Sequence, residues 1–207
     1  MSIVSSELTQ ARREEIIDAC EKLYRTRSFK EITIKDIAQE TSFSRASVYN
    51  YFETKEEVFT ALMQREYERW TEMLRSRTEE AKELSLEGAA EILADTLSGR
   101  VQLLKLLSMN HYDMEEHTRP ELLVVFKKAF YGSIQAVQEL IGCVGGAGRP
   151  DPKGFTYYFF PAMFGFYPYC VATDKQKEAM KAAGMSGKER DLRSMIFDYA
   201  LTLLKSV

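Results

Sequence analysis

Residues 32–59 read ITIKDIAQETSFSRASVYNYFETKEEVF. Thr33 is a suitable N-cap for a short helix, and Asp36 lies in the first turn, where a negative charge favours the positive end of the helix dipole. Ala38 has a one-carbon side chain, which allows a second helix to cross closely after a tight turn at Thr41–Phe43, with the phenylalanine filling the space between the helices. The pattern predicts a helix-turn-helix unit.

The residues after this turn predict a second short helix, which Ser44 can cap. Val48 and Phe52 face inward on this helix, while its outward face combines small, aromatic and hydrogen-bonding side chains. Such a face suits the major groove of DNA, because Arg45 can reach guanine O6 and N7, Asn50 can reach base edges or backbone, and alanine or serine can lie beside a thymine methyl group. The candidate DNA-contacting residues are Thr33, Lys35, Ser44, Arg45, Ala46, Ser47, Tyr49, Asn50, Tyr51 and Lys55.

Three of these candidates, Tyr49, Tyr51 and Lys55, are expected to reach phosphates, which would position the protein on DNA without specifying sequence. Lys55 lies in the T-K-E-E segment, residues 54–57, in which Thr54 and Glu57 can form a capping box. A long helix should begin there and bury one apolar stripe. The stripe consists of Phe59, Met63, Tyr67, Trp70 and Leu74.

The stretch resembles the DNA-binding module of the TetR family of bacterial regulators, which has a small helix-turn-helix followed by Y-x-Y/H-F-x-x-K-E-x-L/V-F. The resemblance is specific over residues 9–62. It departs at Ser42, where the family commonly has Gly; a left-handed backbone at Ser42 would cost about 1 kcal/mol. The matching residues are Ile34, Ile37, Ala38, Phe43, Ser44, Val48, Tyr49, Tyr51, Phe52, Lys55, Glu56, Val58 and Phe59.

The whole chain is expected to be all-α, because apolar residues recur every three or four positions and no stretch sustains period-two alternation. A helix-turn-helix DNA-binding domain would occupy residues 1–53. A helical ligand-binding and dimerisation domain would occupy residues 54–207, joined by the long helix from residue 54. Besides a first helix at 9–26 and the short pair, we expect helices at 86–97, 100–109, 120–141, 153–172, 175–183 and 188–205.

Residues 155–169 are unusually aromatic, and Pro161 and Pro168 should bend any helix that contains them. Bends open cavities, so these aromatic side chains could line a mostly apolar pocket; they could equally be core or dimer interface. The resemblance implies such a pocket, with a ligand that changes the spacing of the two DNA-reading helices. The candidate ligand-binding residues are Met109, His111, Phe126, Phe130, Tyr158, Phe159, Met163, Phe166 and Tyr167.

A single reading helix covers few base pairs, so specificity requires a homodimer on a pseudo-palindromic operator, with reading helices about 34–36 Å apart or a multiple of that distance. The helix near 153–172 and the last helix are the candidate dimer elements. In the family the last two long helices pair as a four-helix bundle. The alternative is that the apolar face of the last helix packs inside its own subunit.

Charge and composition exclude several function classes. The net charge is −3, and residues 1–60 hold nine Lys or Arg against eleven Asp or Glu, so discrimination between DNA sites is left to direct contacts. Three cysteines without C-x-x-C spacing suggest neither disulfides nor zinc, and His111 and His117 do not share a helix face. We expect no metal, no cofactor, no membrane partner and a cytoplasmic location.

Catalytic signatures such as G-x-S-x-G, the P-loop and the dinucleotide fingerprint are missing from the sequence, so an enzyme is not expected. The favoured hypothesis is a ligand-responsive regulator of transcription, more readily a repressor than an activator, that binds double-stranded DNA and is released by a small, mostly apolar or aromatic effector. The alternative is a helical sensor or adaptor that acts through protein partners without sequence-specific DNA binding.

Overall fold

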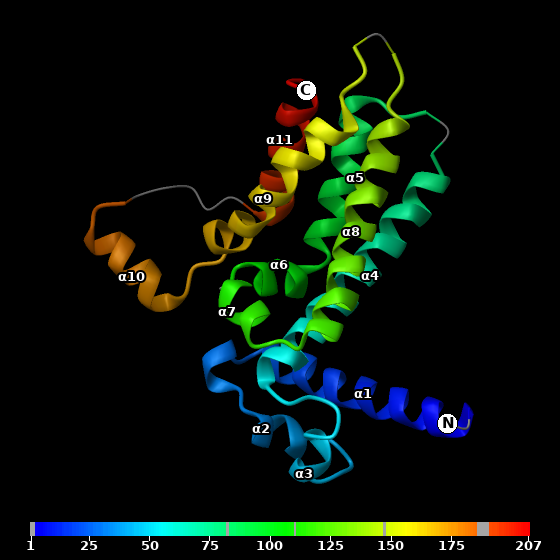
Figure 1. Cartoon of the computed structure of the whole chain (residues 1–207). Helices are drawn as coiled ribbons and strands as arrows, with labels where there is room; N and C mark the ends of the chain where they lie inside the picture. Colours follow the sequence, from blue (N-terminus) through cyan, green and yellow to red (C-terminus); the bar gives the residue numbers. More distant parts are fainter. Residues whose placement is uncertain (1–2, 82, 110, 147, 186–190) are drawn as a thin grey trace. The chain divides into compact units, whose positions relative to one another are not determined.

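The computed structural model describes residues 3–81, 83–109, 111–146, 148–185 and 191–207 (Figure 1). Within them every regular element is helical, and Leu84 and Val144 form the one isolated β-bridge. The all-α class is thereby confirmed. The elements are α1 (Ile3–Tyr24), η1 (Phe29–Glu31), α2 (Ile34–Gln39), α3 (Arg45–Val48), α4 (Lys55–Glu79), α5 (Leu86–Ser98), α6 (Val101–Leu107), α7 (His111–Glu116), α8 (Pro120–Gly142), α9 (Pro152–Cys170), α10 (Asp174–Ala182) and α11 (Leu192–Leu204).

The chain forms two compact units. The first, here called the head, comprises residues 1–65 and 110–129; the second, the body, comprises 66–109 and 130–207. The opening turns of α4 and of α8 therefore pack with the N-terminal helices, whereas the rest of both helices packs in the body. A domain boundary at residue 53 stays a prediction.

The core of the head is built on the apolar stripe of α1, whose members are all buried: Ile16, Ile17, Cys20, Leu23 and Tyr24. Phe59 of α4 packs its ring edge-on against Tyr24, with centroids 5.1 Å apart, and against Phe29, at 4.8 Å. Arg65 then ties α4 to α1, because its guanidinium forms ion pairs with three carboxylates of α1. The partners are Glu14 at 3.3 Å, Asp18 at 2.5 Å and Glu21 at 2.5 Å.

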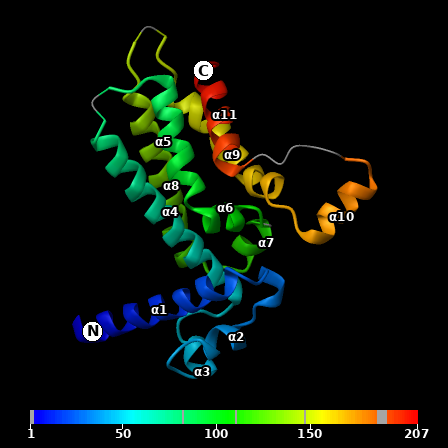
Figure 2. The same cartoon turned by 180° about the vertical axis from the view of Figure 1, so that it is seen from behind.

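The body packs α11 against α5 and α9, and α6 against α9 (Figures 1 and 2). Tyr67, Trp70 and Leu74 continue the predicted stripe of α4 in the body, and all three are buried, as is Met63 of the same stripe in the head. The indole N–H of Trp70 donates to Thr96 Oγ1 of α5 at 3.2 Å, so the one polar atom of this large side chain is satisfied inside the core.

Helix ends agree with the sequence expectations within a few residues, with three differences. α1 begins at Ile3 rather than Thr9, and residues 111–116, which lie between the expected helices 100–109 and 120–141, form the short helix α7. The last helix begins at Leu192, where Asp191 provides the N-cap; residues 188–190 of the expected helix lie outside the described residues. Among the described residues, no helix combines the length and the apolar character needed to span a membrane.

α10 is exposed along its whole length, and none of its residues is buried. Figures 1 and 2 both show it standing apart from the other helices of the body. Its helical form rests on a complete capping box between Thr173 and Gln176. Local sequence, rather than packing, therefore specifies this helix.

Candidate nucleic-acid interface

α2 begins with the cap that the sequence predicts. Thr33 Oγ1 accepts a hydrogen bond from the Asp36 N–H at 3.2 Å, and an Asp36 carboxylate oxygen accepts one from the Thr33 N–H at 2.9 Å. Hydrogen bonds from the Thr33 hydroxyl and from the Thr33 N–H to this carboxylate hold the pKa of Asp36 below its ordinary value. Ile34, Ile37 and Ala38 of this helix are buried, while Thr33 and Lys35 are exposed.

The turn between α2 and α3 is held by α1. Among the described residues no side-chain-bearing residue has positive φ, so Ser42 does not need the left-handed backbone that glycine would relieve. Both its N–H and its hydroxyl donate to the carboxylate of Glu15, at 2.5 and 3.1 Å. Thr41 closes the turn by donating to the Ala38 carbonyl oxygen at 2.9 Å. Phe43 lies half-buried, with its ring centroid 6.3 Å from that of Tyr51.

α3 is a single turn that presents the predicted reading surface. Ser44 Oγ accepts from the Ser47 N–H at 3.3 Å, which confirms the predicted cap. Val48 is fully buried beneath the turn and anchors it in the head core. Arg45 donates to the Tyr49 hydroxyl at 3.1 Å and lies over the same ring, 5.7 Å from its centroid. The exposed residues of this surface are Ser44, Arg45, Ala46, Tyr49 and Asn50; Ser47 is half-buried.

Lys55 points into the protein rather than outward. Its ammonium group donates to the Phe29 carbonyl oxygen at 2.9 Å and to the Ile32 carbonyl oxygen at 3.3 Å, and it lies 4.0 Å from the centroid of the Phe29 ring. The side chain thus fastens the η1 segment to the start of α4. Contact of Lys55 with phosphate stays a prediction, which the geometry does not favour because two of its three N–H donors are used internally.

Three arginines that are not among the candidate DNA-contacting residues surround Tyr51. The Tyr51 hydroxyl lies 3.4 Å from Nη1 of Arg12, and its carbonyl oxygen accepts from Arg13 Nη1 at 3.4 Å and from Arg119 Nη2 at 3.1 Å. Arg13 also stacks on Phe52, with its guanidinium carbon 4.5 Å from the ring centroid. Burial and the nearby Arg119 charge lower the pKa of Arg13.

Arg119 comes from the segment just before α8 and reaches the start of α4. Its Nε and Nη2 donate to the two carboxylate oxygens of Glu57 at 2.7 and 3.0 Å, its backbone N–H donates to the same group at 3.2 Å, and Nη1 lies 3.2 Å from Glu53. Thr54 caps α4 by accepting from the Glu57 N–H at 3.1 Å and donates to the His117 carbonyl oxygen at 2.9 Å. We call the pair Glu57 and Arg119 the head clamp.

The head clamp contains a buried charge that is fully used. Glu57 is 1% exposed, and its carboxylate accepts the Glu53 N–H at 2.7 Å. Burial by itself raises the pKa of Glu57, but the hydrogen bonds from Arg119 and from the Glu53 amide outweigh it, so the pKa lies below its ordinary value. The hydrogen bond to Glu57 in turn raises the pKa of Arg119. The pair therefore stays ionised near neutral pH.

The candidate ligand-binding residues are divided between the two units. His111 and Phe126 belong to the head, and the other seven belong to the body. In the body, Phe159, Met163 and Phe166 are buried, whereas Tyr158 is largely exposed. Phe159 packs on Phe155, Phe160, Phe166 and Tyr199, at centroid distances from 5.0 to 6.3 Å. These side chains form packed core, the alternative that the sequence left open; their role toward a ligand stays a prediction.

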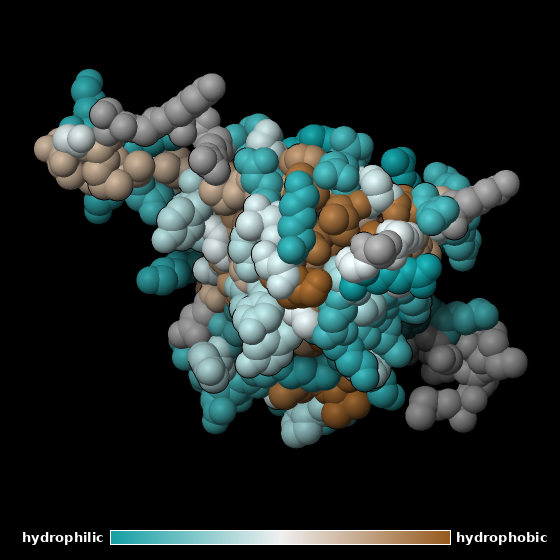
Figure 3. Space-filling view, turned by 90° about the horizontal axis from the view of Figure 1, so that it is seen from above, coloured by the Kyte–Doolittle hydropathy of each residue, from teal (hydrophilic) through white to brown (hydrophobic). Residues whose placement is uncertain are grey.

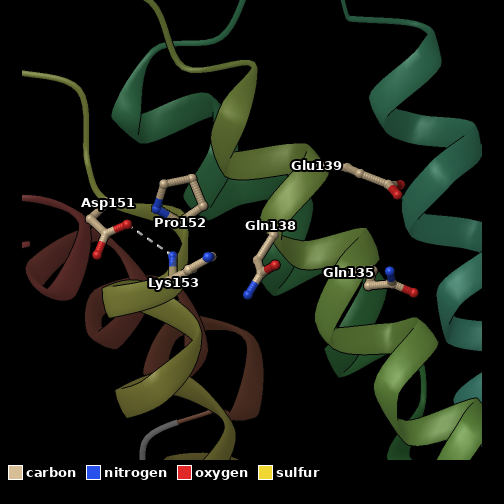
Figure 4. A pocket seen from close by; sticks show the side chains of 6 residues that line it. All are labelled: Gln135, Gln138, Glu139, Asp151, Pro152 and Lys153. Atoms are coloured by element: carbon tan, nitrogen blue, oxygen red, sulfur yellow. Dashed lines mark hydrogen bonds between the residues drawn. The ribbon is translucent and has the colours of Figure 1, made fainter.

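A hollow in the body lies where α8 faces the start of α9 (Figure 4), and five of its six lining residues have polar or charged side chains. None of the nine candidate ligand-binding residues lines it. Gln138 bonds Thr156 at 3.1 Å beside this hollow, and Asp151 caps α9 through the N–H groups of Lys153 and Gly154. The lining residues are Gln135, Gln138, Glu139, Asp151, Pro152 and Lys153.

One face of α9 is exposed and largely aromatic. Tyr157, Pro161, Phe164 and Pro168 recur at helical spacing, and all four are exposed, Tyr157 to 75%. Hydrophobic areas also interrupt the mostly hydrophilic surface in the space-filling view (Figure 3). Tyr199 of α11 donates to the Tyr158 carbonyl oxygen at 3.1 Å and packs on Phe159 and Phe166, which lie on the opposite side of α9 from this face. We call the four residues the α9 face.

Two family models match the chain. Residues 16–62 match the model described as bacterial regulatory proteins, tetR family, and residues 64–205 match the tetracyclin repressor-like, C-terminal domain. Among curated proteins, the uncharacterized HTH-type transcriptional regulator YfiR of Bacillus subtilis is 34% identical over 61 residues, which cover 30% of each chain. The chain thus spans about a third of the length of the curated relatives that it matches.

Solved structures resemble the fold over most of the chain. The fatty acid degradation regulator FadR from Bacillus halodurans has a TM-score of 0.61 and 19% identity, covering 93% of this chain and 94% of that one. FadR from Bacillus subtilis, solved in complex with stearoyl-CoA, has a TM-score of 0.57 and 17% identity, covering 93% and 97%. At these identities the similarity establishes the fold alone.

Proposed function

The chain belongs to the tetR family of bacterial regulatory proteins, and from this premise we propose that it is a ligand-responsive repressor that binds a palindromic operator as a homodimer. DNA binding and regulation of transcription follow from the family. Repression, the operator symmetry, the dimer and the effector are the parts proposed for this chain. Its place of action would be the cytoplasm, where a bacterial regulator meets the chromosome.

The exposed surface of α3 is the observation that carries the proposal. Ser44 caps a turn whose inner side is anchored by Val48, so Arg45, Ala46 and Asn50 are displayed on an ordered backbone. Arg45 lies over Tyr49 in the free protein and can leave that ring for a guanine edge, exchanging one contact for a bidentate pair. Ala46 leaves room for close approach to the groove.

Selection from a random pool of double-stranded DNA at near-physiological salt tests this proposal. Wild type should recover an inverted repeat whose half-sites are about one helical turn, or a multiple of it, apart. Arg45→Ala/Tyr49→Ala should recover none, while Lys181→Ala on the exposed α10 should behave like wild type. Failure of the folded wild type to enrich any sequence would contradict the proposal and favour the adaptor that acts through protein partners.

The α9 face is the surface proposed for the homodimer. Tyr157 and Phe164 expose apolar area on the side of α9 opposite the residues that pack against α11, and burial of such area is the main driving force for association. Phe164→Arg would place an unpaired charge in that interface and should give monomers in sedimentation experiments at micromolar concentration. Tyr131→Arg, at an exposed tyrosine of α8, is the matched control and should leave the mass unchanged. Dimers of Phe164→Arg would locate the interface elsewhere.

The proposed effector is a small, mostly apolar or aromatic molecule. The aromatic residues of α9 support this class, and FadR of Bacillus subtilis, whose fold this chain shares, was solved with stearoyl-CoA. Trp70 is the single tryptophan and packs 6.1 Å from Phe160, so its fluorescence reports on this cluster. Stearoyl-CoA or a simple phenol should change that fluorescence and release the operator, and coenzyme A without an acyl chain is the control. If neither compound changes the fluorescence or the operator binding, both are excluded as effectors.

A further inference from the structure

Arg119 is 68 positions from Tyr51 in the sequence, yet its guanidinium joins the Tyr51 carbonyl oxygen to the buried carboxylate of Glu57. We infer that Arg119 is a positioning residue for DNA binding. It holds the peptide group of Tyr51, at the end of the stretch that carries the candidate DNA-contacting residues of α3, in a fixed position relative to α4, and it does not contact DNA itself. This inference rests on the proposed DNA-reading function of the head.

The buried carboxylate of Glu57 fixes the position of the Arg119 guanidinium. Glu57 is the third residue of α4, and its carboxylate accepts the Glu53 N–H at 2.7 Å beside the positive end of the helix. That carboxylate is almost completely buried, so it has a single defined place. Bidentate bonding then fixes the plane of the Arg119 guanidinium, because both Nε and Nη2 are engaged.

Arg119 in turn holds the peptide group of Tyr51. Nη2 also donates to the Tyr51 carbonyl oxygen at 3.1 Å, and Arg13 of α1 donates to the same oxygen at 3.4 Å. Tyr51 lies between α3 and α4, where the backbone has left the first helix and has not entered the second. Two guanidinium groups therefore hold this peptide in the connection that carries Tyr49, Asn50 and Tyr51.

The bonds made at position 119 require arginine rather than lysine. A lysine would keep the positive charge but offers one compact ammonium group, which cannot reproduce a planar fork on Glu57 together with a bond to the Tyr51 carbonyl. Arg119→Lys is therefore the diagnostic change. The matched control is Arg100→Lys in the body, because Arg100 bonds the buried Glu66 in the same bidentate way, at 3.1 and 2.6 Å.

The test measures operator affinity by fluorescence anisotropy as a function of salt, at a temperature where all variants are folded. Arg119→Lys should weaken binding about tenfold, the effect of losing one charge-assisted hydrogen bond. The salt dependence should stay unchanged, since Arg119 does not contact phosphate. Arg100→Lys should bind like wild type.

A second measurement needs no DNA. Hydrogen exchange at the amides of residues 49–53 should be faster in Arg119→Lys than in wild type and unchanged in Arg100→Lys. Unchanged exchange and unchanged affinity would overturn the positioning role, as would a shallower salt dependence of binding, which would place Arg119 on a phosphate. If exchange increases as expected but wild type binds no DNA, the positioning geometry holds and the proposed function fails.

Discussion

The head and the body each contain a buried glutamate of α4 held by an arginine that precedes another helix. In the head, Glu57 is held by Arg119; in the body, Glu66 is held by Arg100, the N-cap residue of α6, and we call that pair the body clamp. Both carboxylates are 1% exposed. The difference lies in the other partners: Arg119 also bonds the Tyr51 carbonyl oxygen, whereas the body carboxylate recruits a second arginine, Arg69, at 2.9 Å.

The same ion-pair chemistry therefore has two roles in this chain. The body clamp joins the middle of α4 to the start of α6 and contributes to the stability of the body. The head clamp does the same for α4 and the start of α8, and it adds a bond to the peptide of a DNA-contacting candidate. Stability and DNA affinity should therefore separate between the two clamps.

Complete removal of either arginine should have the largest effect. Arg100→Met and Arg119→Met each leave a buried carboxylate without its partner, which costs about 3–5 kcal/mol of unfolding free energy. Urea unfolding followed by circular dichroism measures this loss. At equal amounts of folded protein, Arg119→Met alone should also lose operator affinity. Equal affinity of both variants would remove the distinction between the clamps.

Arg45→Ala should change DNA recognition while both clamps stay intact, so it separates DNA binding from stability. It should reduce discrimination at one base position by about 1–3 kcal/mol, since a bidentate contact to guanine is lost, and should leave unfolding unchanged. Competition binding with operators varied one base at a time measures it. A uniform loss for every operator would assign Arg45 to the phosphates instead.

Lys55→Ala separates an internal role from a phosphate contact. The ammonium group bonds the Phe29 and Ile32 carbonyl oxygens, so we expect a loss of about 1 kcal/mol in unfolding free energy. The dependence of log affinity on log salt should stay as in wild type. A slope shallower by about one would instead place Lys55 on a phosphate. Lys30→Ala, at an exposed lysine of η1, is the control.

Acid should weaken the head by the smallest amount. Because the pKa of folded Glu57 lies below its ordinary value of 4.5, this group contributes stability that is present above that pH and is lost as the pH falls below it. Unfolding free energy measured from pH 6 downward should therefore decline, and Glu57→Gln should remove that part of the decline. A parallel decline in Glu57→Gln would assign it to other carboxylates.

Sequence reasoning predicted the features that depend on neighbouring residues. The caps at Thr33, Ser44 and Thr54 and the buried stripe of α4 follow from local spacing, and each is present. Helix α7 was missed because its six residues, H-Y-D-M-E-E, carry one buried apolar side chain and therefore show no periodicity.

Long-range features were beyond reach for physical reasons. A motif places a cation at Lys55 but does not say which oxygen atoms lie nearby, so its internal carbonyl partners could not be predicted. Arg119 gave no signal at all, because its role depends on chain segments 62 and 68 positions apart. Aromatic enrichment in α9 is equally compatible with core, pocket and interface, and the burial of Phe159 and Met163 could only come from the fold.

The bond between Ser42 and Glu15 has a consequence for how such chains diverge. At the turn before α3, the main-chain N–H and the hydroxyl of Ser42 both donate to the carboxylate of Glu15, a residue of α1. Substitution at either position removes a partner from the other, so the two should covary among homologues, with an acidic residue at 15 accompanying serine at 42. Operator preference would then change through substitutions on α1, at a distance from the candidate DNA-contacting residues.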